Sequence, residues 1–390
     1  MRRVANGLGV WLMIGVIGWA GIVWIGWTLW QSTPPRAGFD LALLLEAARR
    51  VTAGQGPYDP AMLAGTAPAA TSLFYSYPPP VAQAMTLLAW LSDGTVLVLW
   101  GIAAILGLGA VAWQLAREAG RPLARDDALR AMAVAAVFLP FSVAVLFGNL
   151  DVFYPVLYGA VLLSVLPGAS RTTQVVGGAA AAVAVIAKLH PAPLLLWVAV
   201  RAARSRGGQD GRVLGAALVT GVVVLLASLL IGGTRPWLDY LTVVRVAGGA
   251  SLVDSRNAGP VSLLGLLTGL DGSVLIAIQL AVVVAVAVVT VVAGVRVRDP
   301  LTGFAIVAVA SLVTLPITWY HYLGALVPVA IALAVRFPSA RMRIAVAAVV
   351  ADIAIGFVPV MWIGVAILLV AARSDAAARA GSRPVLVVPQ

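Results

Sequence analysis

Apolar runs of membrane-spanning length recur throughout this chain. The first, Leu8–Trp30, contains no charged residue. Of the 390 residues, 62% are hydrophobic and only 11% are charged, and the mean hydropathy is +1.01. A soluble domain cannot bury so much apolar surface, and helices are the plausible spanning segments because the backbone must satisfy its own hydrogen bonds in lipid. The sequence therefore predicts an all-α polytopic membrane protein, built as one integral membrane domain over residues 1–390.

The distribution of basic residues predicts how the chain lies in the membrane. The formal net charge is +11, and its excess falls in short loops beside apolar runs, such as 117–130 and 201–212. Cytoplasmic loops of membrane proteins show this bias. We therefore expect a multi-pass plasma-membrane protein with both termini in the cytoplasm and no nucleic-acid partner. Leu8–Trp30 is too long for a signal peptide and is expected to be an uncleaved first span.

About twelve crossings are expected. They fall at 8–30, 94–116, 128–147, 151–166, 173–188, 191–200, 213–232, 274–295, 301–316, 322–335, 343–357 and 360–372. A further apolar segment, Pro78–Leu91, has 14 residues, or about 21 Å of helix, which is short for a crossing. We expect it to enter from the outer side as a re-entrant helix. Leu41–Ala53 carries Glu46 and Arg50 opposite its leucines, which predicts an amphipathic helix at the membrane surface.

The predicted topology places the conspicuous polar motifs on one face. Two long extracytoplasmic loops, 31–77 and 233–272, are available to cover that face. The motifs are Phe39-Asp40, Tyr75–Pro79, Gly148–Asp151, Lys188–Pro191, Arg256-Asn257 and Trp319–Tyr322. Transporters more often place such groups near the middle of the membrane. The pattern therefore predicts an active site on the extracytoplasmic side.

Asp40 is the leading candidate for a catalytic group. An acidic residue beside a bilayer is costly and calls for a reason. One reason is general-base catalysis, in which the carboxylate accepts a proton from an incoming hydroxyl. The other is helix capping, which aspartate favours. Both roles stay open from the residues alone.

Basic and aromatic residues form the remaining candidate set. Lys188 and His190 flank a broken helix end where a phosphate could be neutralised, although Lys188 could instead extend to the membrane interface. His321 is a candidate for donor phosphate or sugar binding, and Arg256 for a phosphate, which its guanidinium can bind bidentately. Asn149 and Asp151 either cap the next helix or line the site. The other candidates for the cleft or for acceptor binding are Tyr58, Tyr75, Tyr77, Asn257, Trp319 and Tyr320. An interfacial aromatic belt is the alternative for the tyrosines.

Several familiar sites are missing from the sequence. It has no phosphate-binding glycine loop and no His-Glu-x-x-His helix,. It has no Gly-x-Ser-x-Gly elbow and no cysteine,. Asp126-Asp127 is the only adjacent acidic pair, and it falls on the predicted cytoplasmic side. We therefore expect no metal site, no metal-clamped nucleotide sugar and no cofactor.

Taken in chain order, these motifs resemble glycosyltransferase family 87, the polyprenyl-phosphate-sugar-dependent membrane transferases of actinobacteria and relatives. The resemblance rests on Asp40 after the first span, the turn Gly54–Asp59, Tyr77-Pro78-Pro79, Gly148-Asn149, Lys188–Pro191 and Pro316–Tyr322. It implies a GT-C fold, an extracytoplasmic site and no required metal. It also implies that Asp40 is the general base of an inverting reaction, with Lys188, His190 and His321 recognising the donor phosphate or sugar. Arg256 rests on charge and side alone.

The expected reaction follows from this resemblance. A mannosyl residue would move from polyprenyl-phosphate mannose to a hydroxyl of a glycolipid or cell-envelope glycan, with membrane lipids, donor and acceptor as the partners. Arabinofuranosyl transfer from polyprenyl-phosphate arabinose is the close alternative. A lipid-linked sugar flippase or transporter, or a non-catalytic scaffold, would be a different class of protein. The sequence indicates no oligomeric state.

Overall fold

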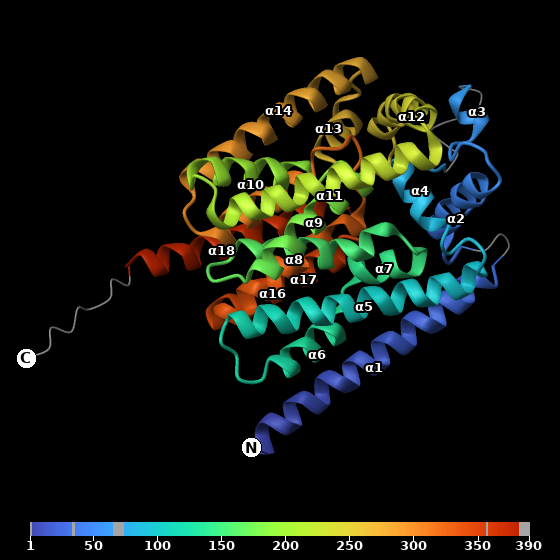
Figure 1. Ribbon diagram of the computed structural model, residues 1–390. Coiled ribbons are helices and arrows are strands. Elements are labelled where there is room, and N and C mark those ends of the chain that lie inside the picture. The colour runs from blue at the N-terminus through green and yellow to red at the C-terminus, as the bar shows by residue number, and fades with distance from the viewer. Residues whose placement is uncertain (1, 33–35, 65–73, 356–357, 382–390) are drawn as a thin grey trace, which may run out of the picture.

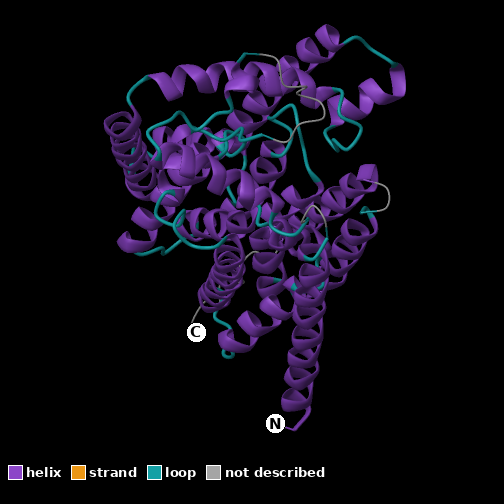
Figure 2. Ribbon diagram, turned by 90° about the vertical axis from the view of Figure 1, so that its right-hand side faces the viewer, coloured by secondary structure: helices purple, strands orange, loops and turns teal. Residues whose placement is uncertain are grey.

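Helices make up all the regular structure in the described part of the chain, as the computed structural model shows (Figures 1 and 2). The structure describes residues 2–32, 36–64, 74–355 and 358–381. This confirms the all-α prediction. Parts of the expected first loop, 33–35 and 65–73, and the C-terminal end after 381 lie outside the described residues, as do positions 356–357 of one expected span.

The elements follow one another with short connections. Their bounds are α1 Arg2–Trp30, α2 Phe39–Thr52, α3 Pro60–Leu63, α4 Pro79–Met85, α5 Asp93–Glu118, α6 Ala124–Ala135, α7 Leu139–Phe147, η1 Leu150–Phe153, α8 Tyr154–Val165, α9 Arg171–Ala187, α10 Ala192–Arg204, α11 Gly208–Gly232, α12 Arg235–Leu252, α13 Pro260–Thr268, α14 Gly272–Arg296, α15 Pro300–Ser311, η2 Tyr320–Leu326, α16 Val327–Arg336, η3 Pro338–Ala340, α17 Arg341–Ile353, η4 Val358–Val360 and α18 Met361–Gly381. The elements marked η are short 3₁₀ helices.

Four of the described helices are long and apolar enough to cross a membrane. They are Gly9–Trp30 within α1, together with α5, α11 and α14. A fifth crossing results if α6 and α7, which are bent by 70° relative to each other, form one broken span. Several other apolar helices are shorter, including α8, α9 and α15. These helices indicate a membrane protein. The twelve crossings, the re-entrant helix and the surface helix remain predictions.

Two expected segments are helical over different ranges than the sequence predicts. In Pro78–Leu91 the α-helix covers only Pro79–Met85, and turns follow it. The hydroxyl of Thr86 donates to the carbonyl of Gln83 at 2.7 Å, a local bond that competes with helix continuation. The expected span 322–335 begins instead as η2, and α16 takes over at Val327.

Small residues allow three helices to pack closely in the centre of the molecule. Helix α9 contacts both α8 and α11. A Cβ on Gly177 would lie 2.2 Å from the Cβ of Ser164 in α8, and one on Gly178 would lie 2.2 Å from the carbonyl oxygen of Val213 in α11. Glycine therefore lets both backbones approach, as small residues do between membrane helices. This packing holds the C-terminal end of α9, and hence Lys188, against the rest of the bundle.

The elements that carry the sequence motifs gather at one end of the bundle. Figure 1 shows α2, α3, α4 and α12 together at that end, whereas the start of α1 lies at the far end. Helix α4 contacts both α2 and α12. A buried core beneath them contains Leu41, Leu44, Tyr75 and Phe141. This core fixes the first loop against α5 and α7.

Candidate active site

A cavity of about 650 Å³ lies among the elements at this end of the molecule. Its lining comes from α2, the segment before α4, α7 and the turn that follows it, the end of α9, α12 and the loop that follows it, and the segment that enters η2. The sequence-predicted residues that line it are Asp40, Tyr77, Asn149, Lys188, Arg256, Trp319, Tyr320 and His321. The fold therefore brings together groups that are up to 281 positions apart in the chain, from Asp40 to His321.

Asp40 lies in the first turn of α2 and forms a hydrogen bond with Asn149. The Asn149 side chain donates from Nδ2 to Asp40 Oδ2 at 2.7 Å. Asn149 also accepts from the backbone N–H of Asp151 at 2.8 Å, so its amide orientation is held from both ends. Gly38 precedes the helix and α2 has no side-chain cap. The capping alternative for Asp40 is therefore wrong, and its carboxylate is available to the cavity.

Gly148 explains how Asn149 comes so close to α2. Its φ angle is +64°, and a Cβ at this position would lie 2.6 Å from the Cβ of Leu41. Only glycine satisfies both the left-handed backbone and the close approach. The backbone N–H of Gly38 also donates to the carbonyl of Leu146 at 2.8 Å. The end of α7 and the start of α2 are thereby joined next to Asp40.

Asp151 holds Lys188 and His321 from behind the cavity wall. Lys188 Nζ lies 3.0 Å from each carboxylate oxygen, and His321 Nε2 lies 3.0 Å from Oδ2. The side chain of Asp151 is 3% exposed and that of Lys188 is 12% exposed. Asp151 does not line the cavity, but both of its partners do. Its role is thus to position the basic groups.

Aromatic rings surround the Lys188 ammonium. The nitrogen lies 3.9 Å from the ring centroid of Tyr322 and 5.7 Å from that of Tyr77. These distances are within the range of cation–π attraction. The side chain is therefore directed into the protein, which contradicts the alternative that Lys188 extends to the membrane interface.

The electrostatic surroundings of Asp40 have opposing effects. Burial raises the pKa of the Asp40 carboxyl above its ordinary value, because the charged form loses hydration,. Three influences oppose that rise in pKa: the charge of His321, the hydrogen bond that Asn149 donates, and the charge of Lys188. The net shift is upward. A carboxylate with a raised pKa is a stronger proton acceptor than an ordinary one, which suits a general base.

His190 is buried behind the cavity and does not line it. Its ring lies 4.8 Å from the ring of Tyr154 and is stacked 5.5 Å from that of Tyr322. Neither ring nitrogen has a hydrogen-bond partner among the described residues. Burial, reinforced by Lys188, lowers the pKa of His190 to about 3, so the ring is neutral. The ring of His190 therefore packs against Tyr322 and does not reach the cavity in which a sugar donor could bind.

Three other predicted residues support the cavity without lining it. Tyr75 donates to the carbonyl of Pro78 at 2.7 Å and accepts from the N–H of Ala82 at 2.8 Å, which fixes the start of α4. Tyr58 donates to the carbonyl of Tyr77 at 3.0 Å. The amide of Asn257 donates to the carbonyl of Pro316 at 2.7 Å and accepts from the N–H of Thr318 at 2.9 Å. Asn257 thereby holds the segment that leads to His321.

Arg256 lies at the exposed rim of the cavity. Its side chain is 58% exposed and forms an ion pair with Asp254. Nε is 2.9 Å from Asp254 Oδ1. The guanidinium also lies 5.5 Å from the ring centroid of Trp319. Because most of this side chain is exposed, water screens its charge, and Arg256 is a weaker phosphate candidate than the largely buried Lys188,.

Two aromatic residues of the site were not proposed individually as site residues from the sequence, although Tyr322 belongs to the motif Trp319–Tyr322. Tyr322 contacts Lys188 and lines the cavity, and its position beside His321 was the available signal. Tyr240, in α12, lines the cavity and stacks on Tyr58 at 6.3 Å. Nothing in its spacing marks it, because only the tertiary fold brings α12 against the first loop.

Comparison with known proteins identifies the family. The model for glycosyltransferase family 87 matches residues 75–318. The chain belongs to glycosyltransferase family 87. The same comparison confirms the resemblance drawn from the motifs and shows that the protein is a glycosyltransferase. The family match begins after Asp40 and ends before His321, so these two residues are placed at the site by the cavity geometry.

A curated relative comes from Mycobacterium tuberculosis (strain ATCC 25618 / H37Rv). It is named polyprenol-phosphate-mannose-dependent alpha-(1-2)-phosphatidylinositol mannoside mannosyltransferase. The two sequences are 26% identical over 332 residues, which cover 80% of this chain and 72% of the relative. The aligned length exceeds that of the family match.

Proposed function

We propose that this family 87 enzyme transfers a mannosyl residue from polyprenyl-phosphate mannose to a hydroxyl of a glycolipid or cell-envelope glycan. The reaction takes place on the extracytoplasmic face, inverts the anomeric centre and requires no metal. One observation carries the proposal: Asp40 lines the same cavity as Lys188 and His321. A proton acceptor and groups suited to a phosphate leaving group thus share one space.

The proposed chemistry is a single displacement. The acceptor hydroxyl gives its proton to the Asp40 carboxylate as its oxygen attacks the anomeric carbon of the donor sugar. The bond from that carbon to the phosphate oxygen breaks on the opposite face, and polyprenyl phosphate leaves with the electron pair. This two-face arrangement follows the logic of inverting glycosidases, with a sugar or lipid hydroxyl in place of water.

Lys188 and His321 are assigned to the phosphate. Developing negative charge is stabilised most by donors that are already in place, because they need not reorganise during the reaction. Asp151 supplies that preorganisation through its 3.0 Å contacts with both side chains. An ammonium has three N–H donors, so Lys188 retains one for the donor phosphate beyond the two carboxylate oxygens.

Mannose is preferred to arabinofuranose as the donor sugar. The supporting observation is the name of the M. tuberculosis relative, which specifies polyprenol-phosphate mannose. The tyrosine and tryptophan rings along the cavity, Tyr77, Tyr240 and Trp319, offer apolar faces to a sugar ring or a lipid,. The acceptor is assigned only as a hydroxyl compound of the envelope.

The test is transfer by the Asp40→Asn variant. Membranes that contain the full-length protein are incubated with radiolabelled polyprenyl-phosphate mannose in the presence of a chelator, and the lipid products are separated. Loss of the general base should lower transfer at least ~10²-fold while the amount of folded protein is unchanged. Asp271→Asn is the matched control, because Asp271 is exposed, caps α14 and does not line the cavity.

Different outcomes would contradict different parts of the proposal. Equal transfer by wild-type and Asp40→Asn protein would remove Asp40 as the base. Loss of wild-type transfer on chelation would show a metal requirement. Transfer of arabinose but not mannose would overturn the donor assignment. Movement of the lipid-linked sugar across the membrane without a new glycosidic bond would indicate a flippase.

A further inference from the structure

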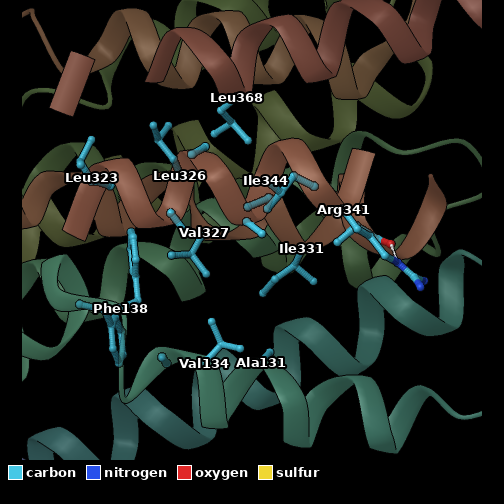
Figure 3. Close-up of a pocket in the computed structure, with 18 of the residues that line it drawn as sticks. Ala131, Val134, Phe138, Leu323, Leu326, Val327, Ile331, Arg341, Ile344 and Leu368 are labelled. Atoms are coloured by element: carbon cyan, nitrogen blue, oxygen red, sulfur yellow. Dashed lines mark hydrogen bonds between the residues drawn. The ribbon is translucent and has the colours of Figure 1, made fainter. Parts of the chain in front are cut away.

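A second cavity, of about 470 Å³, lies between α6, α16, α17 and α18. Its walls are almost entirely apolar, with side chains such as Phe138, Leu326, Ile331 and Leu368 (Figure 3). Its volume falls within the range of pockets that bind small molecules. None of the residues assigned above to catalysis or donor binding lines it.

The two cavities lie at successive levels of the same helices. Helix α17 and its end contribute Ala351 to the second cavity and Ile355 to the first. The segment around η2 contributes Leu323 to the second and Tyr320 to the first. The second cavity therefore continues along the bundle away from Asp40. It ends near the starts of α6 and α17, where the chain becomes basic.

One end of the second cavity carries charged side chains in an otherwise apolar lining. Arg130, Arg341 and Asp127 are the charged residues that line it. Figure 3 shows Arg341 at one end, with Phe138 and Leu323 at the other. An apolar space with positive charge at one end matches the shape of a lipid with an anionic headgroup.

The acidic residue does not neutralise this end. The Asp127 carboxylate accepts from Arg121 Nε at 3.2 Å and from Arg130 Nη1 at 3.1 Å. One negative charge is thus divided between two arginines, and Arg341 adds a third positive charge. The side chain of Arg341 donates from Nε to the carbonyl of Ala334 at 2.9 Å, which holds the guanidinium in place at the cavity end.

Arg130 supplies an independent indication that an acceptor belongs here. Its Nε is buried and has no hydrogen-bond partner among the described residues. Buried polar groups almost always have a partner, from the protein or from something bound to it. A phosphate oxygen is a suitable acceptor for an arginine N–H.

We propose that this second cavity binds one anionic glycerophospholipid. The phosphate lies against Arg130 and Arg341, and an acyl chain occupies the apolar walls between Phe138 and Leu368. The isoprenoid tail of a sugar donor fits the apolar walls but has no group for the two arginines, since its phosphate is needed at Lys188. Charge complementarity therefore favours the phospholipid, which would fasten α17 to α6.

The experiment measures lipid retention by the purified full-length protein. The protein is exchanged into mixed micelles with equal amounts of phosphatidylglycerol and phosphatidylcholine, and bound lipids are counted by native mass spectrometry. We expect preferential retention of phosphatidylglycerol. The double variant Arg130→Gln/Arg341→Gln should retain it roughly thirtyfold less, because each arginine near an anionic headgroup contributes ~1 kcal/mol and about 1.4 kcal/mol corresponds to a tenfold change. Arg296→Gln, at the end of α14 and away from the cavity, is the control and should retain it like wild type.

A cavity-filling variant separates this site from nonspecific charge. Ala348 lines the cavity, and Ala348→Phe should reduce retention while leaving both arginines in place. Equal retention of the two lipids by wild-type protein would overturn the proposal, and that measurement does not depend on any variant folding. Retention of added polyprenyl phosphate in place of phosphatidylglycerol would also overturn it, by assigning the cavity to an isoprenoid tail. Neither result depends on sugar transfer.

Discussion

Asp40 depends on a neighbouring amide for part of its electrostatic environment. Burial raises its pKa, while the Asn149 hydrogen bond stabilises the charged form. A base must be ionised, so transfer should be lost as pH falls through the raised pKa of Asp40. In Asn149→Ser the bond to Asp40 is lost, but serine can still accept from the backbone at a helix start. The Asp40 pKa must then rise further.

The acid limb of the pH profile of kcat/KM should therefore move to higher pH in Asn149→Ser. A shift of about one pH unit is expected, because a hydrogen bond to a charged group contributes ~1.5 kcal/mol and one pKa unit corresponds to about 1.4 kcal/mol. Thr95→Ser, in α5 and outside the cavity lining, serves as the control. An unchanged limb, or one displaced to lower pH, would show that Asp40 is not the group that titrates.

Asp151 and Lys188 form a buried ion pair, and removing one partner alone should destabilise the protein more than removing both. Asp151→Asn leaves the ammonium buried without its counter-charge, and loss of one partner of such a pair costs about 3–5 kcal/mol. Thermal unfolding in detergent should therefore occur at a lower temperature. Adding Lys188→Met should recover most of that stability, because no buried charge is left unpaired, but transfer should stay low without the phosphate contact.

Two comparisons bear on that prediction. Asp239→Asn breaks an ion pair with the 82% exposed Arg235 and should cost less than ~1 kcal/mol. Additive losses in the double variant, with no recovery, would mean that Asp151 and Lys188 are not energetically coupled.

At the scale of elements, the turn between α7 and η1 decides where Asn149 lies. Gly148→Ala places a Cβ against Leu41 and imposes an unfavourable positive φ. The turn should move away from α2, and transfer should fall by roughly ten- to a hundredfold, as small displacements of catalytic groups do. Gly120→Ala is the matched control, because Gly120 has φ +67° but open space around it. Equal effects in both variants would indicate backbone strain alone.

At the scale of the whole molecule, the charge bias predicts which end of the bundle faces outward. The chain contains no cysteine, so single cysteines report their own accessibility. Gln55→Cys, in the first loop near α2, should react with a membrane-impermeant maleimide in intact cells. Ala203→Cys, between Arg201 and Arg204 in the last turn of α10, should react only after permeabilisation. The reverse pattern would place the active site in the cytoplasm. Both positions are exposed.

Much of the site was predictable from local chemistry, and the misses have identifiable causes. Lys188 and His321 stood out because charged and titratable side chains are rare in apolar sequence. His190 stood out for the same reason, but its ring is buried behind Tyr322. Local sequence does not show which side of a chain turn faces a cavity. The number of crossings was also difficult to predict. Short apolar helices such as α8 have the composition of spans without their length, and the pair α6–α7 reaches the length of a span only across a 70° bend.

The sequence by itself determined that this is a helical membrane protein of glycosyltransferase family 87. Hydrophobic composition and the order of the motifs are properties of the linear chain, so they can be recognised without knowing how the helices pack. Only the tertiary structure decided that Asn149 holds Asp40, that Asp151 holds Lys188 and His321, and that Tyr240 joins the cavity. The physical reason is that these contacts connect segments far apart in the chain. They form where glycines such as Gly148 let helices approach, and the linear sequence does not encode those distances locally.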